Sequence, residues 1–337
     1  MLRKKPTLIF LIIFFLISSS VSGQSQEVKF LIDTCIKIMQ VNAANSNRVN
    51  WKKIKQTALA KSKNINDPYQ LGPVIRYLYQ SVDDFHGSFY YKDSTFHWQK
   101  TKSVISDSIM NEWKKRVHIM PLMLGDGVGY LRVPSMPYPD KKDADKHAQM
   151  LNDSLCFLLD KQVKGIILDL RLDGGGSMYP MILGLEQLLA PGEIGHFLSK
   201  KRINWYLTEN NFLLDSNVMA SIFPKCTTNA QHIPVVVLIG PGTASSGEFL
   251  TMAFKPRKKT LFLGTETAGY VTSNAGFPIN DAAFVLLATG YGADREGRIY
   301  KKAIRPDIHM EAVDKFNNVE MDEKVQAAIN WLKQNSN

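Results

Sequence analysis

The chain has 337 residues, of which 45% are hydrophobic and 21% charged, a balance typical of a globular protein. This length is enough for one large domain or two smaller ones with a sizeable core. The formal net charge of +10 suits proximity to an anionic membrane surface. No arginine-rich or aromatic-interleaved patch accompanies that charge, so we expect no nucleic-acid partner.

The first 23 residues have the pattern of a secretory signal. The basic residues Arg3, Lys4 and Lys5 precede an apolar run over residues 8–17 and a small-residue stretch that ends at Gly23. We therefore expect export to the periplasm or cell envelope with cleavage after Gly23. Removing those three basic residues lowers the net charge from +10 to +7. A retained N-terminal membrane anchor is the alternative, and no cysteine follows Gly23 to carry a lipid.

The cysteines are Cys35, Cys156 and Cys226. Their number is odd and their spacing fits neither a metal site nor a disulfide framework. We expect each to be a small buried hydrophobic residue, and we expect neither a metal nor a cofactor.

Apolar residues at helical spacing dominate the chain up to residue 85. They predict helices over residues 27–39, 51–62 and 73–82, and hence a helical N-terminal domain over residues 24–85. Residues 86–116 follow a break in this pattern. They are interpreted as a cap or flap segment that begins with a hairpin after Phe89.

From residue 117 onward, short β-branched runs alternate with amphipathic stretches. This alternation predicts an α/β core over residues 117–337 with a largely parallel sheet. Residues 191–232 are predicted to be an irregular insert, in which Trp205 and Tyr206 either pack or face substrate. The predicted strands are residues 122–124, 128–133, 164–170, 235–239, 260–264, 284–288 and 299–304, and the predicted helices are 143–161, 181–189 and 319–334.

The most informative stretch is residues 234–250. A buried strand ends at a turn, Gly240-Pro241-Gly242, after which a helix opens on hydroxyl residues that include Ser245. The N–H groups at the start of a helix are free, so a nucleophile at this position would lie beside oxyanion donors. Ser245-x-x-Glu248 is also a capping box, which needs no chemistry. The two readings are compatible, since a cap would fix the turn that presents Ser245.

A second glycine loop, Asp173-Gly174-Gly175-Gly176, follows another predicted strand. Loops at the carboxyl ends of parallel strands line the ligand crevice, so the two loops are expected to meet. The Ser246 N–H and a glycine N–H could then hold an oxyanion. The alternative for the glycines is a plain tight turn. Neither a Walker sequence nor Gly-x-Gly-x-x-Gly is present to suggest a phosphate site.

A serine nucleophile requires a base. His86 lies in a glycine-flanked break, Phe85-His86-Gly87-Ser88, whereas the other six histidines have no motif around them. The alternative is a loop histidine without a role. The acids that could orient the His86 ring are Asp83, Asp84, Glu248 and Glu266, and spacing does not choose among them.

Four motifs, taken in order, resemble the C-terminal processing peptidase (tail-specific protease) family, nearest to the branch that contains the nisin resistance protein. They are the stretches at residues 129–135, 166–176, 243–248 and 304–307. The resemblance implies a crotonase-like (ClpP/crotonase type) α/β core with a helical N-terminal domain and a small cap. It also implies Ser245 as nucleophile, His86 as general base, and an oxyanion hole formed by Ser246 with Gly175 or Gly176.

The sequence departs from other branches of this family. Tyr270 stands where serine–lysine members carry their lysine, and residues 300–302 lack the glutamate of some histidine-using members. The segment between His86 and Val128 is too short for a PDZ domain. The resemblance thus implies an exported serine endopeptidase that acts on peptides or unstructured protein tails.

An alternative is a catalytically inactive peptide-binding protein of the same fold. An α/β-hydrolase esterase is disfavoured because Gly-x-Ser-x-Gly is absent. The oligomeric state and the identity of the peptide stay open.

Overall fold

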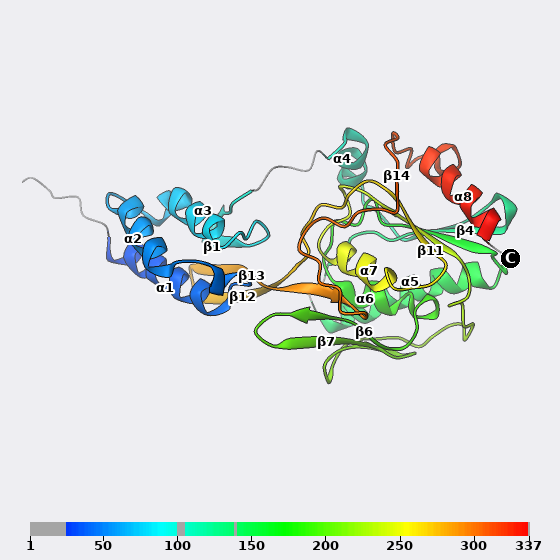
Figure 1. Ribbon diagram of the computed structural model, residues 1–337, viewed down its shortest axis with the longest axis horizontal. Helices are drawn as coiled ribbons and strands as arrows, with labels where there is room; N and C mark the ends of the chain where they lie inside the picture. The colour runs from blue at the N-terminus through cyan, green and yellow to red at the C-terminus, as the bar shows by residue number, and fades with distance from the viewer. Residues whose placement is uncertain (1–24, 100–104, 138–139, 336–337) are drawn as a thin grey trace, which may run out of the picture.

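The computed structural model describes residues 25–99, 105–137 and 140–335 (Figure 1). The predicted signal over residues 1–23 lies outside this part of the chain. Among the described residues, no helix combines the length and apolar character needed to cross a membrane.

The helices predicted in the N-terminal region are present. Ser25 and Asn50 cap the first two by accepting the N–H groups of Val28 and Lys53. The apolar faces of the three helices enclose one hydrophobic core together with β1 and part of β13. The elements are α1 (Gln26–Asn42), η1 (Ser46–Arg48), α2 (Trp51–Ser62), η2 (Pro68–Gln70), α3 (Gly72–Ser81), β1 (Ser88–Tyr91) and β2 (Ser94–Phe96).

One antiparallel sheet joins this helical region to the rest of the molecule. Its order is β2-β1-β13-β6-β7-β8-β9, with β12 paired to β13. β13 pairs with β1 at Leu286 and with β6 at Tyr291, so one strand crosses from one region to the other (Figure 1). The further strands are β6 (Gly192–Leu198), β7 (Arg202–Leu207), β8 (Asn211–Leu214), β9 (Asn217–Ser221), β12 (Thr272–Asn280) and β13 (Ala283–Asp294).

The second sheet has the order β14-β11-β10-β5-β4-β3 and is parallel except between β3 and β4. It confirms the predicted parallel sheet, although the antiparallel sheet beside it was not expected. Its strands are β3 (Met120–Leu124), β4 (Val128–Arg132), β5 (Gly165–Asp169), β10 (Val235–Ile239), β11 (Thr260–Gly264) and β14 (Ile308–His309).

Helices cover both faces of the parallel sheet, which explains its continuous apolar strands. Val235 and Val237 of β10 face the core that includes α5, α6 and α7, whereas Val236 and Leu238 face α8. The helices are α4 (Asp107–Lys114), η3 (Gly125–Gly127), α5 (Lys141–Leu159), α6 (Met178–Leu183), η4 (Glu186–Leu188), α7 (Ser246–Phe254), η5 (Val319–Met321) and α8 (Glu323–Asn335).

Two secondary-structure predictions were wrong. The range 191–232 is not irregular throughout, because residues 192–221 form the antiparallel strands β6–β9 with their connecting turns, whereas residues 222–232 form no helix or strand. Trp205 of β7 is fully buried and packs on Phe197 and Phe249, so tertiary packing orders strands whose local signal is weak. The strand predicted over residues 299–304 is reduced to a bridge between Ala293 and Ile299.

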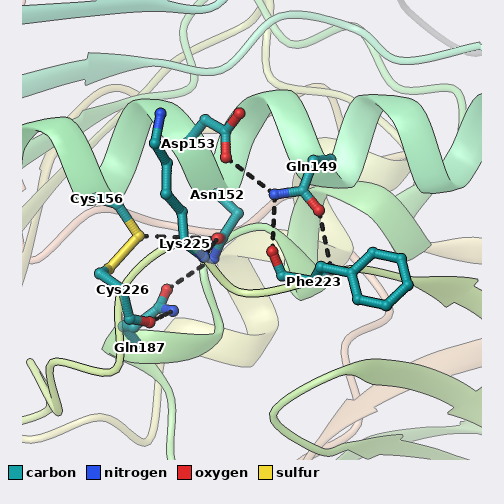
Figure 2. The surroundings of a disulfide bond; sticks show 8 residues. All are labelled: Gln149, Asn152, Asp153, Cys156, Gln187, Phe223, Lys225 and Cys226. Atoms are coloured by element: carbon teal, nitrogen blue, oxygen red, sulfur yellow. Dashed lines mark hydrogen bonds between the residues drawn. A yellow bond between two sulfur atoms is a disulfide. The ribbon is translucent and has the colours of Figure 1, made fainter.

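The prediction for two of the cysteines was also wrong. Cys156 of α5 and Cys226 form a disulfide, with 5.6 Å between their Cα atoms (Figure 2). The two residues are 70 positions apart, and the tertiary fold brings them together, so local spacing carries no signal. Cys35 is buried and free, as expected, and burial raises its pKa.

Candidate active site

Ser245 is the N-cap residue of α7 and lies in the turn that follows the carboxyl end of β10. Its backbone has φ 52° and ψ −112°, a conformation that is uncommon for a residue with a side chain. The turn before it is fixed by the Thr243 hydroxyl, which donates to the Leu170 carbonyl at the end of β5. Such strain is held in place by surrounding structure and concentrates at functional sites.

Glu248 fixes this turn from inside the protein. One carboxylate oxygen accepts the Ser245 N–H at 3.0 Å, which is the capping-box contact predicted for this pair. The other oxygen accepts the Thr267 hydroxyl and, at 2.8 Å, the Gly269 N–H. Burial raises the pKa of Glu248 to about 7. Glu248 therefore ties Ser245 to the segment 267–270.

The two glycine loops meet around Ser245, as predicted. The Asp173 carbonyl accepts the Ala244 N–H at 2.9 Å, and the Ser246 hydroxyl donates to the Gly176 carbonyl at 2.8 Å. A side chain on Gly175 would place its Cβ 2.8 Å from the Cβ of Ser245, and Gly175 has φ +110°. Only glycine suits this approach.

The amides of the glycine loop are not equivalent. The Gly175 N–H donates to Asp173 Oδ1 at 3.0 Å, and the Gly174 N–H donates to the Ser135 hydroxyl at 2.8 Å. Among the described residues, the N–H groups of Gly176 and Ser246 have no acceptor. Those two amides are therefore the ones available to an incoming oxyanion.

His86 lies at the junction between the helical region and the strands β12 and β13. Its Nδ1 is 3.0 Å from the Thr272 hydroxyl oxygen, and its ring packs edge-on against Tyr270 at 5.0 Å. Burial lowers the pKa of His86 to about 4, and the Thr272 contact opposes that shift. The imidazole is thus neutral near pH 7, with Nε2 as its second nitrogen.

The segment 267–272 connects the two expected catalytic residues. Gly269 is bound to Glu248, which also holds Ser245, while Tyr270 and Thr272 contact the His86 ring. Tyr270, which the resemblance aligns with the lysine of serine–lysine members, packs here against the ring of His86.

Three of the four candidate orienting acids, Asp84, Glu248 and Glu266, have partners other than the His86 ring. Asp84 accepts the N–H groups of His86, Gly87 and Ala288 at 2.7–3.0 Å, so it shapes the backbone of the histidine loop. Glu248 binds as described above, and Glu266 pairs with Arg305 at the surface. The ring partner is Thr272, which sequence reasoning missed. A threonine at the start of a strand carries no distinguishing local signal.

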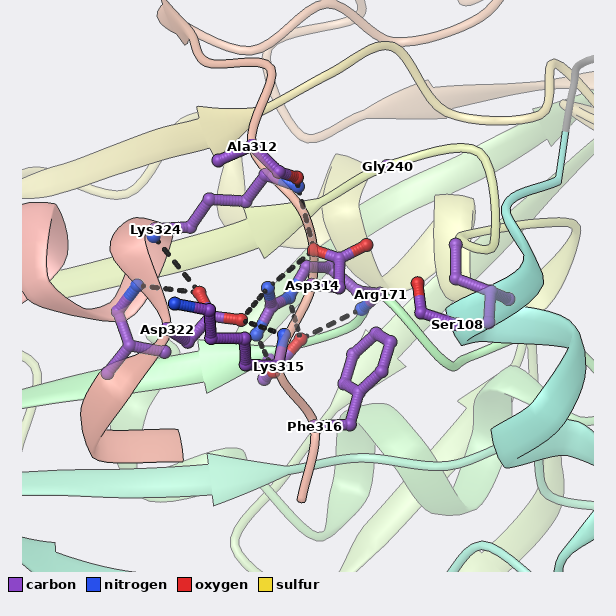
Figure 3. Close-up of polar contacts among 12 residues, drawn as sticks. Ser108, Arg171, Gly240, Ala312, Asp314, Lys315, Phe316, Asp322 and Lys324 are labelled. Carbon is purple, nitrogen blue, oxygen red and sulfur yellow. Dashed lines mark hydrogen bonds and ion pairs between the residues drawn. The ribbon is translucent and has the colours of Figure 1, made fainter. Parts of the chain in front are cut away.

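A buried ion network supports the end of β5 (Figure 3). Arg171 pairs with Asp169 and Asp314 at 2.7 Å each and with Asp322 at 2.9 Å, and the Phe316 ring lies 4.9 Å from its guanidinium. Lys324 adds a second pair to Asp314. These contacts fasten the strand end that leads into the glycine loop to the C-terminal segment.

The model of peptidase family S41 matches residues 127–310, more than half of the chain. The chain belongs to peptidase family S41. The match includes Ser245 and both glycine loops, whereas His86 lies before it. The family assignment therefore agrees with the resemblance seen in the motifs.

Relatives of this S41 chain include the nisin-resistance protein of Lactococcus lactis subsp. lactis. It is 30% identical over 206 residues, which are 60% of this chain and 59% of the relative. A carboxy-terminal-processing protease of Bartonella bacilliformis is 26% identical over 185 residues, 55% of this chain and 39% of the relative. The chain thus spans less than two thirds of the length of these curated relatives.

Solved structures show the same fold. A lipoprotein from Streptococcus agalactiae has a TM-score of 0.66 at 23% identity, covering 96% of this chain and 99% of its own. The photosystem II D1 C-terminal processing protease has a TM-score of 0.52 at 15% identity, covering 84% of this chain and 93% of its own. Both likenesses extend beyond the residues matched by the family model, and the 96% coverage by the lipoprotein takes in the helical N-terminal region.

Proposed function

We propose that this S41 chain is an exported serine endopeptidase of the carboxyl-terminal processing type. The observation that carries the proposal is the meeting of two glycine loops around Ser245, where the N–H groups of Ser246 and Gly176 have no acceptor among the described residues. Membership of S41 and relatives named as carboxy-terminal processing proteases support the reaction class.

In the proposed mechanism, Ser245 Oγ attacks the carbonyl carbon of the scissile peptide bond. His86 Nε2 takes the serine proton, because Nδ1 is engaged by Thr272. The Ser246 and Gly176 N–H groups stabilise the oxyanion. His86 then protonates the leaving amine, and water hydrolyses the acyl-enzyme by the same route in reverse.

The substrate we propose is a peptide or an unstructured protein tail that lies between the helical region and the α/β core. In this proposal residues 24–85 form a helical domain, residues 86–116 contribute a small cap, and residues 117–337 form a crotonase-like core. Export, to the periplasm or cell envelope, rests on the signal pattern of residues 1–23, and no cofactor is required.

A fluorophosphonate probe and a peptide panel test the proposal together. We expect the probe to label Ser245 in the parent protein, and we expect labelling and cleavage to disappear in Ser245→Ala. His86→Ala should lower labelling at least about 100-fold, since general-base catalysis contributes that much. Cleavage by Ser245→Ala at the parent rate would refute the proposal.

The same experiment addresses the peptide-binding alternative. The observation that favours it is the threonine, rather than a carboxylate, at His86 Nδ1. A parent protein that binds peptides but is neither labelled nor able to cleave them would establish this second function.

A further inference from the structure

Asp173 is a buried carboxyl that the mechanism above does not use. It lies at the turn after β5 and is fully buried. Its Oδ1 accepts the Gly175 N–H at 3.0 Å, and its main-chain carbonyl accepts the Ala244 N–H at 2.9 Å. One residue thus contacts both the glycine loop and the residue before Ser245.

The first turn of α7 packs directly on this side chain. A Cβ on Gly247 would lie 2.9 Å from Asp173 Cγ and 2.7 Å from the Asp173 carbonyl oxygen. The absence of a side chain at Gly247 therefore makes room for Asp173 beneath the helix start. Asp173 is enclosed by the same backbone segments that carry Ser245, Gly175 and the Ser246 amide.

The second carboxyl oxygen is unusual. Asp173 Oδ2 is buried and, within the described part of the chain, has no hydrogen-bond partner. Burial raises the pKa of Asp173 well above its usual value, against the opposing effect of the Gly175 contact. This direction favours the protonated carboxyl, which is the form that places no negative charge beside a developing oxyanion.

The hydrogen bond from Gly175 has a geometric consequence. It commits the Gly175 N–H to Asp173, while the Gly176 carbonyl accepts the Ser246 hydroxyl and the Gly176 N–H keeps no acceptor among the described residues. The Asp173 side chain therefore selects which glycine amide is presented beside Ser245.

We propose that Asp173 is a positioning residue of the oxyanion hole: its Oδ1 accepts the Gly175 N–H and so directs the Gly176 amide toward the oxyanion. This inference rests on the proposed function. It goes beyond that function by giving a role to a residue that touches neither substrate nor reacting atoms.

The test compares two variants of similar shape in the full chain. Asp173→Asn keeps an oxygen that can accept the Gly175 N–H, whereas Asp173→Leu keeps the branching at Cγ and removes the acceptor. We expect Asp173→Asn to retain kcat within about threefold. We expect Asp173→Leu to lose about 100-fold in kcat with KM within about twofold, as for loss of one oxyanion donor.

The affinity for a peptide boronic acid, which forms a tetrahedral adduct with serine, should fall in Asp173→Leu in parallel with kcat. Thermal unfolding establishes that each variant is folded, and Asp173→Ala replaces the leucine variant if that one does not fold. Parent-like kcat in the acceptor-free variant, or equal losses in it and in Asp173→Asn, would overturn the role.

Ser245→Ala separates this outcome from failure of the proposed function. If Ser245→Ala still cleaves, the catalytic assignment itself fails. If Ser245→Ala is inactive while the acceptor-free variant is unimpaired, only the role of Asp173 is refuted.

Discussion

Thr272 is the residue-level feature that distinguishes this site from a serine–histidine–acid arrangement. Its hydroxyl oxygen lies 3.0 Å from His86 Nδ1, while the nearby carboxylate of Asp84 is occupied by three backbone amides. A neutral hydroxyl can hold the ring in one orientation but stabilises an imidazolium less than a carboxylate does. We therefore expect a base that is well oriented but weak.

Replacing Thr272 tests this orientation. Thr272→Val keeps the branched shape and removes the hydroxyl, so we expect kcat to fall about tenfold because the ring loses its partner. Thr272→Ser keeps the hydroxyl and should stay within about threefold of the parent. Steady-state kinetics on one peptide substrate measure both. A valine variant as active as the serine variant would contradict the orienting role.

The pH dependence follows from the pKa of His86, which partial burial lowers to about 4. The base must be neutral, so we expect kcat/KM to fall as pH drops through about 4. In the unfolded chain the pKa of this histidine is about 6.5, so the unfolded state binds a proton at a higher pH than the folded state does. The free energy of unfolding should therefore decrease as pH falls from about 6.5 to about 4. The loss is at most about 3 kcal/mol, because the ring is not fully buried.

Measurement of urea unfolding between pH 7 and pH 4 checks the stability half of this prediction. His86→Asn should lack this contribution and show a shallower decline. A histidine NMR titration that places the pKa of His86 near 6.5 would contradict the lowered value.

At the scale of elements, the disulfide joins α5 to the segment that follows β9. Around it, Asn152 Nδ2 donates to Gln187 Oε1 at 2.9 Å, and Gln187 Nε2 donates to the Cys226 carbonyl at 3.1 Å (Figure 2). These buried amides hold the Cys226 segment close to α5. The covalent bond and the polar contacts therefore stabilise the same packing.

Loss of this bond should destabilise the fold by about 2–4 kcal/mol, because the loop that it closes is long. Cys156→Ser/Cys226→Ser and the reduced parent should show the same urea midpoint, below that of the oxidised parent. Reductant should leave the double variant unchanged, which is the control for effects on Cys35. An unchanged midpoint on reduction would show that the polar contacts suffice.

The sequence predicted those elements whose signals are local. Residues 234–250 contain a β-branched run, a glycine turn and a helix start within one short stretch, and the structure has β10 and α7 there. The meeting of the two glycine loops followed from a general rule for parallel sheets. In contrast, β6–β9, the pairing of Cys156 with Cys226, and Thr272 at His86 depend on contacts between distant segments.

At the scale of the whole molecule, β13 sets how the helical region lies relative to the α/β core. Asn45 reinforces this relation, since its side-chain amide donates to the Val82 carbonyl at 3.1 Å and to the Tyr291 hydroxyl at 3.0 Å. The Ala44 N–H also donates to the Ala288 carbonyl at 2.9 Å. His86 follows Val82 closely in the chain, so these contacts position the proposed base.

Tyr291→Phe should test the contact between Asn45 and Tyr291 alone. It removes the tyrosine hydroxyl and leaves the hydrogen bond between Asn45 and Val82 in place. We expect kcat/KM to fall up to about tenfold, since small displacements of a base reduce rate steeply. Asn45→Ala, which removes both bonds, should have a larger effect. Kinetics and thermal unfolding together measure these losses, and parent-like kcat/KM in Tyr291→Phe would show that β13 alone suffices.

The disulfide between Cys156 and Cys226 also makes residues 156–226 a covalently closed loop. This loop includes β5, the 173–176 loop and strands β6–β9. With the proposed peptidase activity, each molecule would be exposed to cleavage by other copies of the same chain. A single cut inside this closed loop cannot release a fragment, so the glycine loop would stay attached to the molecule after such a cut. We expect protein nicked between these cysteines to migrate as one chain on a non-reducing gel and as two fragments after reduction.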